Sequence, residues 1–202
     1  MTTFQKTLAN TLPTTLERKL NSLAATDLSQ ELEAKACVAS ILRGSTLDTL
    51  EVAYIRRAIS EHDRWSGQMA FPGGKFEEGD LDDFDTAARE VREETGIVLD
   101  REECLGRLHD IQARKRGSLL DFYIRPLVFY IDREVDLILD PAEVADFFWV
   151  PLTRLQDPTR LRTYEWKEGE NTLELPAIQL HGDPPLWGLT YLMTQDLLGR
   201  IL

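Results

Sequence analysis

The stretch that decides the fold runs from Gly73 to Ile97 and reads GGKFEEGDLDDFDTAAREVREETGI. It opens with two glycines, which permit backbone conformations closed to other residues and let a ligand approach the main chain. An acid-rich helix is expected next, with Asp82 or Asp83 as its N-cap and Gly96 at its end. Acids in its first turn suit the helix dipole. The segment therefore predicts a helix entered from a glycine loop.

Three carboxylates share one face of this predicted helix. Glu90, Glu93 and Glu94 stand at positions i, i+3 and i+4, which brings their side chains within about 6 Å of one another. Such a cluster repels itself unless a cation lies among its members, and oxygen ligands select hard divalent ions such as Mg²⁺ or Mn²⁺. A solvated acidic face satisfied by Arg89 or Arg92 is an open alternative. The preceding glycines favour the metal site, because their backbone groups lie beside the carboxylates.

Composition and charge exclude several classes of function. The chain has 202 residues, 43% hydrophobic and 29% charged, which suits one domain with its own core. Its net charge of -12 argues against a nucleic-acid-binding face and a basic membrane-surface patch. No run approaches the roughly 20 apolar residues of a membrane-spanning helix, and no secretory signal is evident. We expect a cytoplasmic protein whose partners include neither nucleic acid nor membrane.

The rest of the chain alternates short predicted strands with helices. Residues 1–33 are expected to form an N-terminal helical arm, and residues 34–202 the main domain with a C-terminal helix over 187–202. A helical turn is expected over 141–147. Pro126 suggests an edge strand or a bulge. Apolar runs rich in β-branched and aromatic residues predict strands over 36–42, 50–55, 104–112 and 121–131.

The glycine loop and helix resemble the Nudix box, written G-x5-E-x7-R-E-U-x-E-E-x-G-U with U an apolar residue. The second half, from Arg89 to Ile97, matches at every position. In the first half, which starts at Gly74, Asp80 stands where the box has Glu, and eight residues rather than seven separate it from Arg89. Both departures, with the Phe-Pro-Gly-Gly opening, are similar to the coenzyme A pyrophosphatase-like branch of this family.

Further landmarks of that branch extend the resemblance over about residues 36 to 200. Residues 67–74 fit the G-x3-F-P-G-G half of its companion motif, and residues 148–152 and 187–190 look like its later landmarks. The other half, L-L-T-x-R-S/A-x3-R-x3-G, is spaced differently here. Five residues follow Arg57-Ala58 before Arg64, and two separate Arg64 from Gly67.

The resemblance implies an α/β (α+β) fold, the Nudix fold, with a mixed β-sheet sandwiched between helices. It also implies that Glu90 and Glu94 are the principal metal ligands, that Glu93 completes the cluster, and that the Gly74 carbonyl is a further ligand. The three glutamates form the catalytic set. Asp80 is either a peripheral ligand or a helix-start residue. Three residues are expected to support the site structurally: Arg89, Gly73 and Gly96.

The activity implied is hydrolysis of the pyrophosphate bond of a nucleoside diphosphate derivative, dependent on Mg²⁺ or Mn²⁺. Coenzyme A or acyl-coenzyme A is the leading substrate, cleaved to phosphopantetheine species and adenosine 3′,5′-bisphosphate. ADP-ribose, reduced nicotinamide dinucleotide and sugar nucleotides are alternative substrates. A non-catalytic, nucleotide-sensing Nudix module is an alternative of another class. The expected partner is thus a small nucleotide, and a homodimer is left open.

Several residues outside the helix are candidates for substrate contact or proton transfer. Arg56, Arg57 and Arg64 lie just ahead of the glycine loop and are expected to bind phosphate. Glu143 is a candidate general base, with a helix-capping acid as the alternative. Three aromatic residues are candidates for nucleobase stacking, with core packing as the alternative: Trp65, Phe76 and Tyr123.

Overall fold

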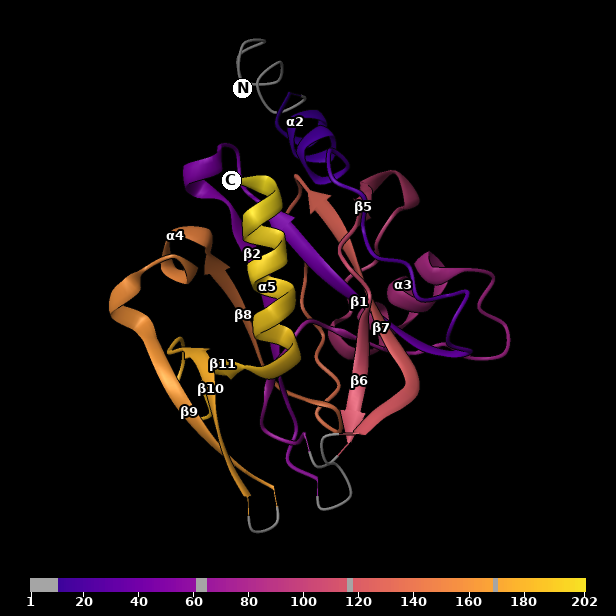
Figure 1. Cartoon of the computed structure of the whole chain (residues 1–202). Coiled ribbons are helices and arrows are strands. Elements are labelled where there is room, and N and C mark those ends of the chain that lie inside the picture. The colour runs from indigo at the N-terminus through magenta and orange to yellow at the C-terminus, as the bar shows by residue number, and fades with distance from the viewer. Residues whose placement is uncertain (1–10, 61–64, 116–117, 169–170) are drawn as a thin grey trace.

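Eight strands of the computed structural model form one mixed sheet, within the described residues 11–60, 65–115, 118–168 and 171–202 (Figure 1). The strands are β1 (Ala34–Arg43), β2 (Glu51–Arg57), β3 (Met69–Ala70), β4 (Gly73–Lys75), β5 (Cys104–Arg107), β6 (Ile111–Lys115), β7 (Ser118–Ile131) and β8 (Val144–Pro151). The path through the sheet is β3-β2-β1-β7-β5, and β4, β6 and β8 pair with β1, β7 and β2. Because β1 and β7 are parallel whereas β1 and β2 are antiparallel, the sheet is mixed.

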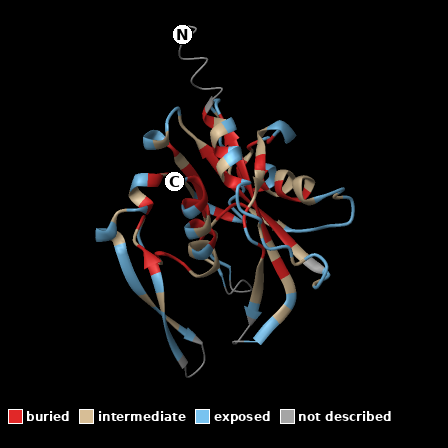
Figure 2. Ribbon diagram, turned by 45° about the horizontal axis from the view of Figure 1, so that its top comes forward, coloured by how far each residue is buried: buried red, intermediate tan, exposed pale blue. Residues whose placement is uncertain are grey.

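Helices and a smaller sheet complete the part of the chain that the structure describes. The helices are α2 (Thr11–Leu20), α3 (Asp83–Thr95), α4 (Leu152–Leu155) and α5 (Gly188–Ile201), with short 3-10 helices at Leu47–Thr49, Arg101–Glu103 and Pro158–Arg160. The smaller sheet comprises β9 (Leu161–Glu168), β10 (Asn171–Ile178) and β11 (Leu186–Trp187). Figure 1 shows α5 running across the larger sheet and the β9–β10 hairpin set off to one side. Figure 2 shows that much of this hairpin is exposed.

Both faces of the larger sheet are buried. In β1, Cys37 and Ile41 belong to a hydrophobic cluster that includes Val91 of α3. Their neighbours Val38 and Leu42 belong to a second cluster, which contains apolar residues of α2 and α5. Because successive side chains of a strand point to opposite faces, α3 covers one side of the sheet and α2 and α5 cover the other. The predicted fold class, a mixed sheet between helices, is confirmed.

The predicted glycine-loop helix forms where its end signals place it. α3 begins after Asp82, whose side chain accepts a hydrogen bond from the backbone N–H of Asp85. It ends at Gly96, which adopts the left-handed conformation with a φ of 77°. The strands predicted over 36–42 and 50–55 correspond to β1 and β2. Local signals thus located the elements that hold the candidate site.

Two predicted segments are wrong in part. The strand expected over 104–112 is interrupted, because the backbone N–H of Asp110 donates to Thr26 of the N-terminal segment instead of joining the ladder. The helical turn expected over 141–147 ends early. Residues 141–143 form a turn, but β8 begins at Val144, because pairing with β2 overrides the local preference.

Pro126 lies inside the sheet rather than on an edge strand. It pairs with Val38 of β1, and its carbonyl accepts a hydrogen bond from the N–H of Leu108. The N–H and C=O of one strand residue point to the same side, so the missing N–H of Pro126 faces the β5–β6 side. There the ladder is already interrupted between Arg107 and Ile111. The interruption accommodates a proline that a continuous central ladder would exclude.

The segment before β1 is only partly helical. The helix α2 buries Leu12, Leu16 and Leu20 in the cluster that it shares with α5. Residues 21–33 form turns and irregular structure, and residues 1–10 of the expected arm lie outside the described residues. Each helix in the described part of the chain is too short or too polar to traverse a lipid bilayer.

Candidate active site

The short strand β4 places two glycines between β1 and α3. Gly73 has a φ of 143°, and a Cβ on it would lie 2.4 Å from the carbonyl oxygen of Cys37. A Cβ on Gly74 would instead lie 2.4 Å from the Oε1 of Glu90. Both distances are shorter than any real carbon contact. Gly73 is therefore required for close strand pairing, and Gly74 leaves the space that the carboxylate occupies.

Glu94 is a nearly buried carboxyl beside these glycines. It is 2% exposed, and its Oε2 accepts a hydrogen bond of 2.8 Å from the backbone N–H of Gly73. Burial raises the pKa of Glu94 to about 8, and the charges of Glu90 and Glu143 act in the same direction, whereas that of Arg57 opposes them. A negative charge on Glu94 therefore requires compensation that the surrounding protein supplies only in part.

Glu90 and Glu93 differ in how they meet this site. Burial raises the pKa of Glu90, the charges of Glu93 and Glu143 add to that effect, and Arg89 opposes it. The Glu90 side chain is 13% exposed, whereas that of Glu93 is 50% exposed. The structure therefore brings Glu90 and Glu94 to the glycine strand and leaves Glu93 at the rim.

Arg89 ties the helix to the segment that precedes it. Its Nε and Nη2 donate to the two carboxylate oxygens of Asp80, at 3.0 and 3.1 Å. Its Nη1 donates to Glu90 at 3.0 Å and to Glu93 at 3.1 Å, and Nη2 also donates to the carbonyl of Lys75 at 2.9 Å. The Arg89 guanidinium lowers the pKa of Asp80 to about 2. Asp80 thus acts here as the anion that anchors Arg89.

The donor set fits a hard divalent cation. Glu90 and Glu94 supply partly desolvated oxygens whose raised pKa values a cation would lower. At Gly74, a side chain would fill the space beside the Glu90 carboxylate. No three acidic, histidine or cysteine side chains of the described residues converge into a closed metal-binding group. An ion held by Glu90, Glu94 and main-chain oxygen would therefore keep positions for phosphate and water.

A further acidic residue, Glu143, comes from a distant loop and acts on this site. The negative charge of Glu143 acts on both Glu90 and Glu94. Its loop is fixed at two points: the Glu143 carbonyl accepts a 2.8 Å hydrogen bond from the N–H of Ala58, and the N–H of Asp140 donates to the carbonyl of Glu94 at 3.1 Å. Glu143 caps no helix, because β8 follows directly. Its role as general base stays a prediction.

The three predicted phosphate-binding arginines have different surroundings. Arg56 donates to the backbone carbonyls of Gly67 and Asp183, each at 3.1 Å, and to that of His181. Its guanidinium therefore clamps two loops together. The positive charge of Arg57 acts on Glu94 and partly offsets the rise in the pKa of that carboxyl. Arg64 lies outside the described residues.

No local sequence pattern predicts the buried ion cluster beside α3, which we call the Arg125 network. Arg125, 7% exposed, binds Asp110 through Nε at 2.9 Å and through Nη2 at 2.7 Å. It also binds Asp83 at 2.6 Å and Asp27 at 2.7 Å. Lys35 forms a further ion pair with Asp83. These partners come from segments far apart in the chain, so only the folded chain reveals the cluster.

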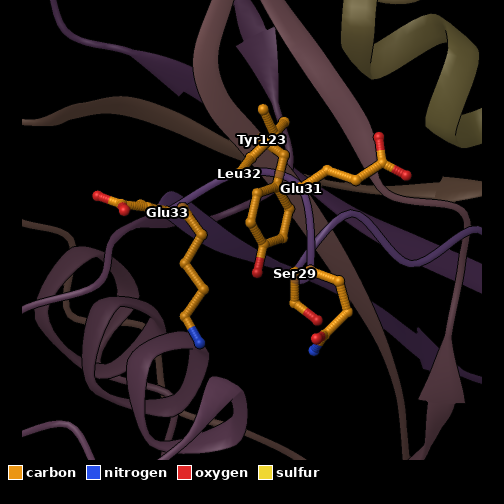
Figure 3. Close-up of a pocket in the computed structure, with 7 residues that line it drawn as sticks. Ser29, Glu31, Leu32, Glu33 and Tyr123 are labelled. Carbon is orange, nitrogen blue, oxygen red and sulfur yellow. The ribbon is translucent and has the colours of Figure 1, made fainter.

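A pocket of about 460 Å³ lies at the start of β1, away from the glutamates. Figure 3 shows Tyr123 between side chains of the preceding segment, including Ser29 and Glu31. Of the described residues lining this pocket, none is a predicted metal ligand or phosphate-binding residue. The pocket is thus separate from the candidate active site.

A comparison with family models assigns the chain to a protein family. The model of the NUDIX domain matches residues 35–169, which include β4, α3 and β8. This chain belongs to the Nudix family of hydrolases.

Curated relatives and a solved structure are similar to this chain. The human protein named mitochondrial coenzyme A diphosphatase NUDT8 is 31% identical over 143 residues, 70% of this chain and 59% of that protein. The mouse protein of the same name is 31% identical over 133 residues, 65% of this chain and 61% of that protein. The chain thus spans about three fifths of the length of these curated relatives. The crystal structure of a MutT/nudix family protein from Enterococcus faecalis has a TM-score of 0.57 at 16% identity, covering 92% of this chain and 72% of that one, and it shares the fold.

Proposed function

We propose that this protein hydrolyses the pyrophosphate bond of a nucleoside diphosphate derivative with the help of Mg²⁺ or Mn²⁺. The observation that carries the proposal is the pair of desolvated carboxylates, Glu90 and Glu94, held against Gly73 and Gly74. A buried acidic pair whose pKa values are raised suits a cation that also binds phosphate. The family assignment supports the same chemistry.

The residues of the site have separate tasks in this reaction. Glu90 and Glu94 would hold the divalent ion, which when bound would neutralise phosphate oxygens and lower the pKa of the attacking water. The glycines let the diphosphate approach the main chain, and the positive charge of Arg57 attracts it. Glu143 accepts the proton of the water. The water oxygen bonds to one phosphorus as the bridging P–O bond breaks, and the second phosphate leaves.

Coenzyme A or an acyl-coenzyme A is the proposed substrate. Its support comes from two sources: the Phe-Pro-Gly-Gly segment before the box, and the coenzyme A diphosphatases among the relatives at 31% identity. The products are then a phosphopantetheine species and adenosine 3′,5′-bisphosphate. We place the reaction in the cytoplasm and leave a homodimer open.

The direct test is a substrate panel in millimolar Mg²⁺ or Mn²⁺, with the products identified by mass. The panel contains coenzyme A, acetyl-coenzyme A, ADP-ribose, reduced nicotinamide dinucleotide, a sugar nucleotide and a nucleoside triphosphate. We expect cleavage of the coenzyme A compounds to adenosine 3′,5′-bisphosphate. Cleavage of another member alone would replace the substrate but keep the chemistry. Metal binding without cleavage of any member would favour a nucleotide sensor.

The variant Glu94→Gln tests the metal assignment. Loss of an outer-shell partner of a metal site costs about 10- to 100-fold, so loss of a direct ligand should lower kcat at least about 100-fold. The fold should persist, because the amide keeps an oxygen for the N–H of Gly73. Glu102→Gln, on an exposed 3-10 helix, is the matched control and should keep full activity. Wild-type activity in Glu94→Gln would remove Glu94 from the metal ligands.

A further inference from the structure

Three indole rings from distant parts of the chain meet beside the smaller sheet. Trp65 lies shortly before β3, Trp166 in β9 and Trp187 in β11. The rings of Trp65 and Trp166 are stacked, with centroids 5.8 Å apart and planes 13° apart. Trp187 lies 4.8 Å from Trp166 and 6.2 Å from Trp65, between centroids. We call these three residues the indole stack.

The indole stack is only partly covered. Trp187 is 7% exposed and forms its floor, whereas Trp65 is 38% exposed and Trp166 is half-buried. Leu173 of β10, opposite Trp166 in the register, is 46% exposed. Directly opposed residues of an antiparallel pair share one face, so Leu173 extends the apolar surface of Trp166. A flat aromatic and aliphatic platform therefore faces solvent at this point.

This platform is joined to the candidate active site by hydrogen bonds. The indole N–H of Trp187 donates to the side-chain carbonyl of Gln68. The backbone carbonyl of Gln68 accepts a 2.9 Å hydrogen bond from the backbone N–H of Arg57, the residue whose side-chain charge acts on Glu94. The chain then continues through β3 to the glycines of β4. The platform thus borders the site on the side of Arg57.

The structure also separates the three aromatic candidates of the sequence. Tyr123 is 2% exposed and lines the separate pocket at the start of β1. Phe76 has one ring face covered by the ammonium of Lys35, 4.5 Å from the ring centroid. Trp65 combines an exposed ring with a stacked neighbour. Of the three, it is the one placed to offer a π-face to a ligand.

We infer that the indole stack binds the nucleobase of the substrate on its solvent-exposed side, where Trp166 supports the ring of Trp65. This inference rests on the proposed function, because a nucleoside diphosphate derivative carries a flat π-system next to the cleaved diphosphate. Indole faces stack on any base, and the neighbouring Arg57 suits the adjoining phosphates. For a coenzyme A substrate, the base is adenine.

The test measures kcat and KM for coenzyme A in Trp166→Leu. Stacking of one base on an aromatic ring corresponds to about a tenfold change in binding, so KM should rise about tenfold with little change in kcat. Trp166→Phe keeps a π-face and should recover most of the loss. Leu161→Ala is the control, because Leu161 is an exposed residue of β9 that lies on the opposite face of the hairpin.

A binding measurement separates this inference from the proposed function. Adenosine 3′,5′-bisphosphate should quench the tryptophan fluorescence of the wild type, with a Kd about tenfold higher in Trp166→Leu. If that variant does not fold, Trp65→Leu should show the same change. Unchanged KM and Kd in a folded variant would overturn the inference but leave the proposed function intact.

Two further outcomes are informative. Bisphosphate binding that depends on Trp166, in a protein that cleaves no panel member, would support the indole stack and overturn the proposed function. Self-association that Trp166→Leu abolishes, with unchanged bisphosphate binding, would show that the platform joins two copies of this chain. That result would overturn the inference.

Discussion

Gly74 lies so close to Glu90 that a methyl group on the glycine would be 2.4 Å from the glutamate Oε1. The box helix and the strand before it therefore meet at a point where only the smallest residue leaves room for the carboxylate. An added methyl group would displace the Glu90 carboxylate, because the flexible Glu90 side chain moves more easily than the paired β4 backbone. The glycine thus determines where the carboxylate sits.

We expect Gly74→Ala to lower activity while preserving the fold. Displacement of Glu90 removes a proposed metal ligand, so kcat should fall at least about 100-fold, and the divalent-ion concentration for half-maximal activity should rise. Gly199→Ala is the control, because nothing lies within 4 Å of its added Cβ in α5, and alanine favours a helix by about 1 kcal/mol. Full activity in Gly74→Ala would show that Glu90 has no fixed position in the reaction.

Glu143→Gln should separate catalysis from binding. A general base contributes about 100- to 10,000-fold, so kcat should fall at least about 100-fold with KM and thermal stability nearly unchanged. Glu134→Gln, an exposed acid of the loop before β8, should behave as the wild type. A variant that keeps its kcat would exclude Glu143 as the base.

The Arg125 network should dominate the effect of charge removal on stability. The Asp110 side chain is 0% exposed, and Arg125→Met leaves this buried charge with only the longer 3.3 Å ion pair to Arg107, so the free energy of unfolding should fall by about 3–5 kcal/mol. Arg101→Met removes an arginine that is 54% exposed and pairs with Asp82 and Asp85, and it should lower the free energy of unfolding far less, because water screens this pair. Urea denaturation of both variants measures the contrast.

A double variant checks the cause. If the loss of the Arg125 charge beside the buried Asp110 carboxylate is responsible, Arg125→Met combined with Asp110→Asn should be more stable than Arg125→Met alone. Equal losses in Arg125→Met and Arg101→Met would contradict the assigned role of burial.

Stability should decrease in acid. Arg89 lowers the pKa of Asp80 to about 2, from a usual value of 3.8. Both states are ionised well above the usual value, so the full contribution is present there. It is lost as the pH falls from about 4 to about 2, because the unfolded chain binds the proton first. The contribution of Asp80 to this loss should be about 2 kcal/mol, measured as the difference between the wild type and Asp80→Asn in urea titrations across this range.

Asp83 should act in the same direction. Burial alone would raise its pKa, but hydrogen bonds from Lys35 and Arg125 outweigh burial and lower it. A wild-type stability that is constant between pH 4 and pH 2 would contradict both assignments.

Local patterns in the sequence predicted the centre of this site because its parts are close in the chain. The helix ends at Asp82 and Gly96 depend on side chains within a few residues, and Glu90 and Glu94 share a face through helix geometry alone. The solvent exposure of each carboxylate could not be predicted from helix spacing. Glu93 has the same spacing but turns to Arg89 at the rim, which depends on what packs beside each turn.

The parts that sequence patterns missed depend on long-range contacts. Arg125 and Asp27 are 98 positions apart, and no local pattern links them. The break between β5 and β6 arises from Asp110 bonding to Thr26, and the start of β8 from pairing with β2. Trp65 and Trp166 become neighbours only because the β9–β10 hairpin folds back. In each case tertiary contacts overrode or supplied what the local sequence lacked.

The Arg125 network also limits how this protein can be inherited and recombined. The family match starts at residue 35, yet Asp27 and the buried leucines of α2 precede it. A gene segment cut at the family boundary would carry Arg125 without one of its counter-ions, and a sheet face without part of its hydrophobic cover. The part of this chain that the family model matches therefore depends on the residues that precede it for a complete fold. Changes in the segment before β1 must therefore be matched by changes in strand residues about a hundred positions away.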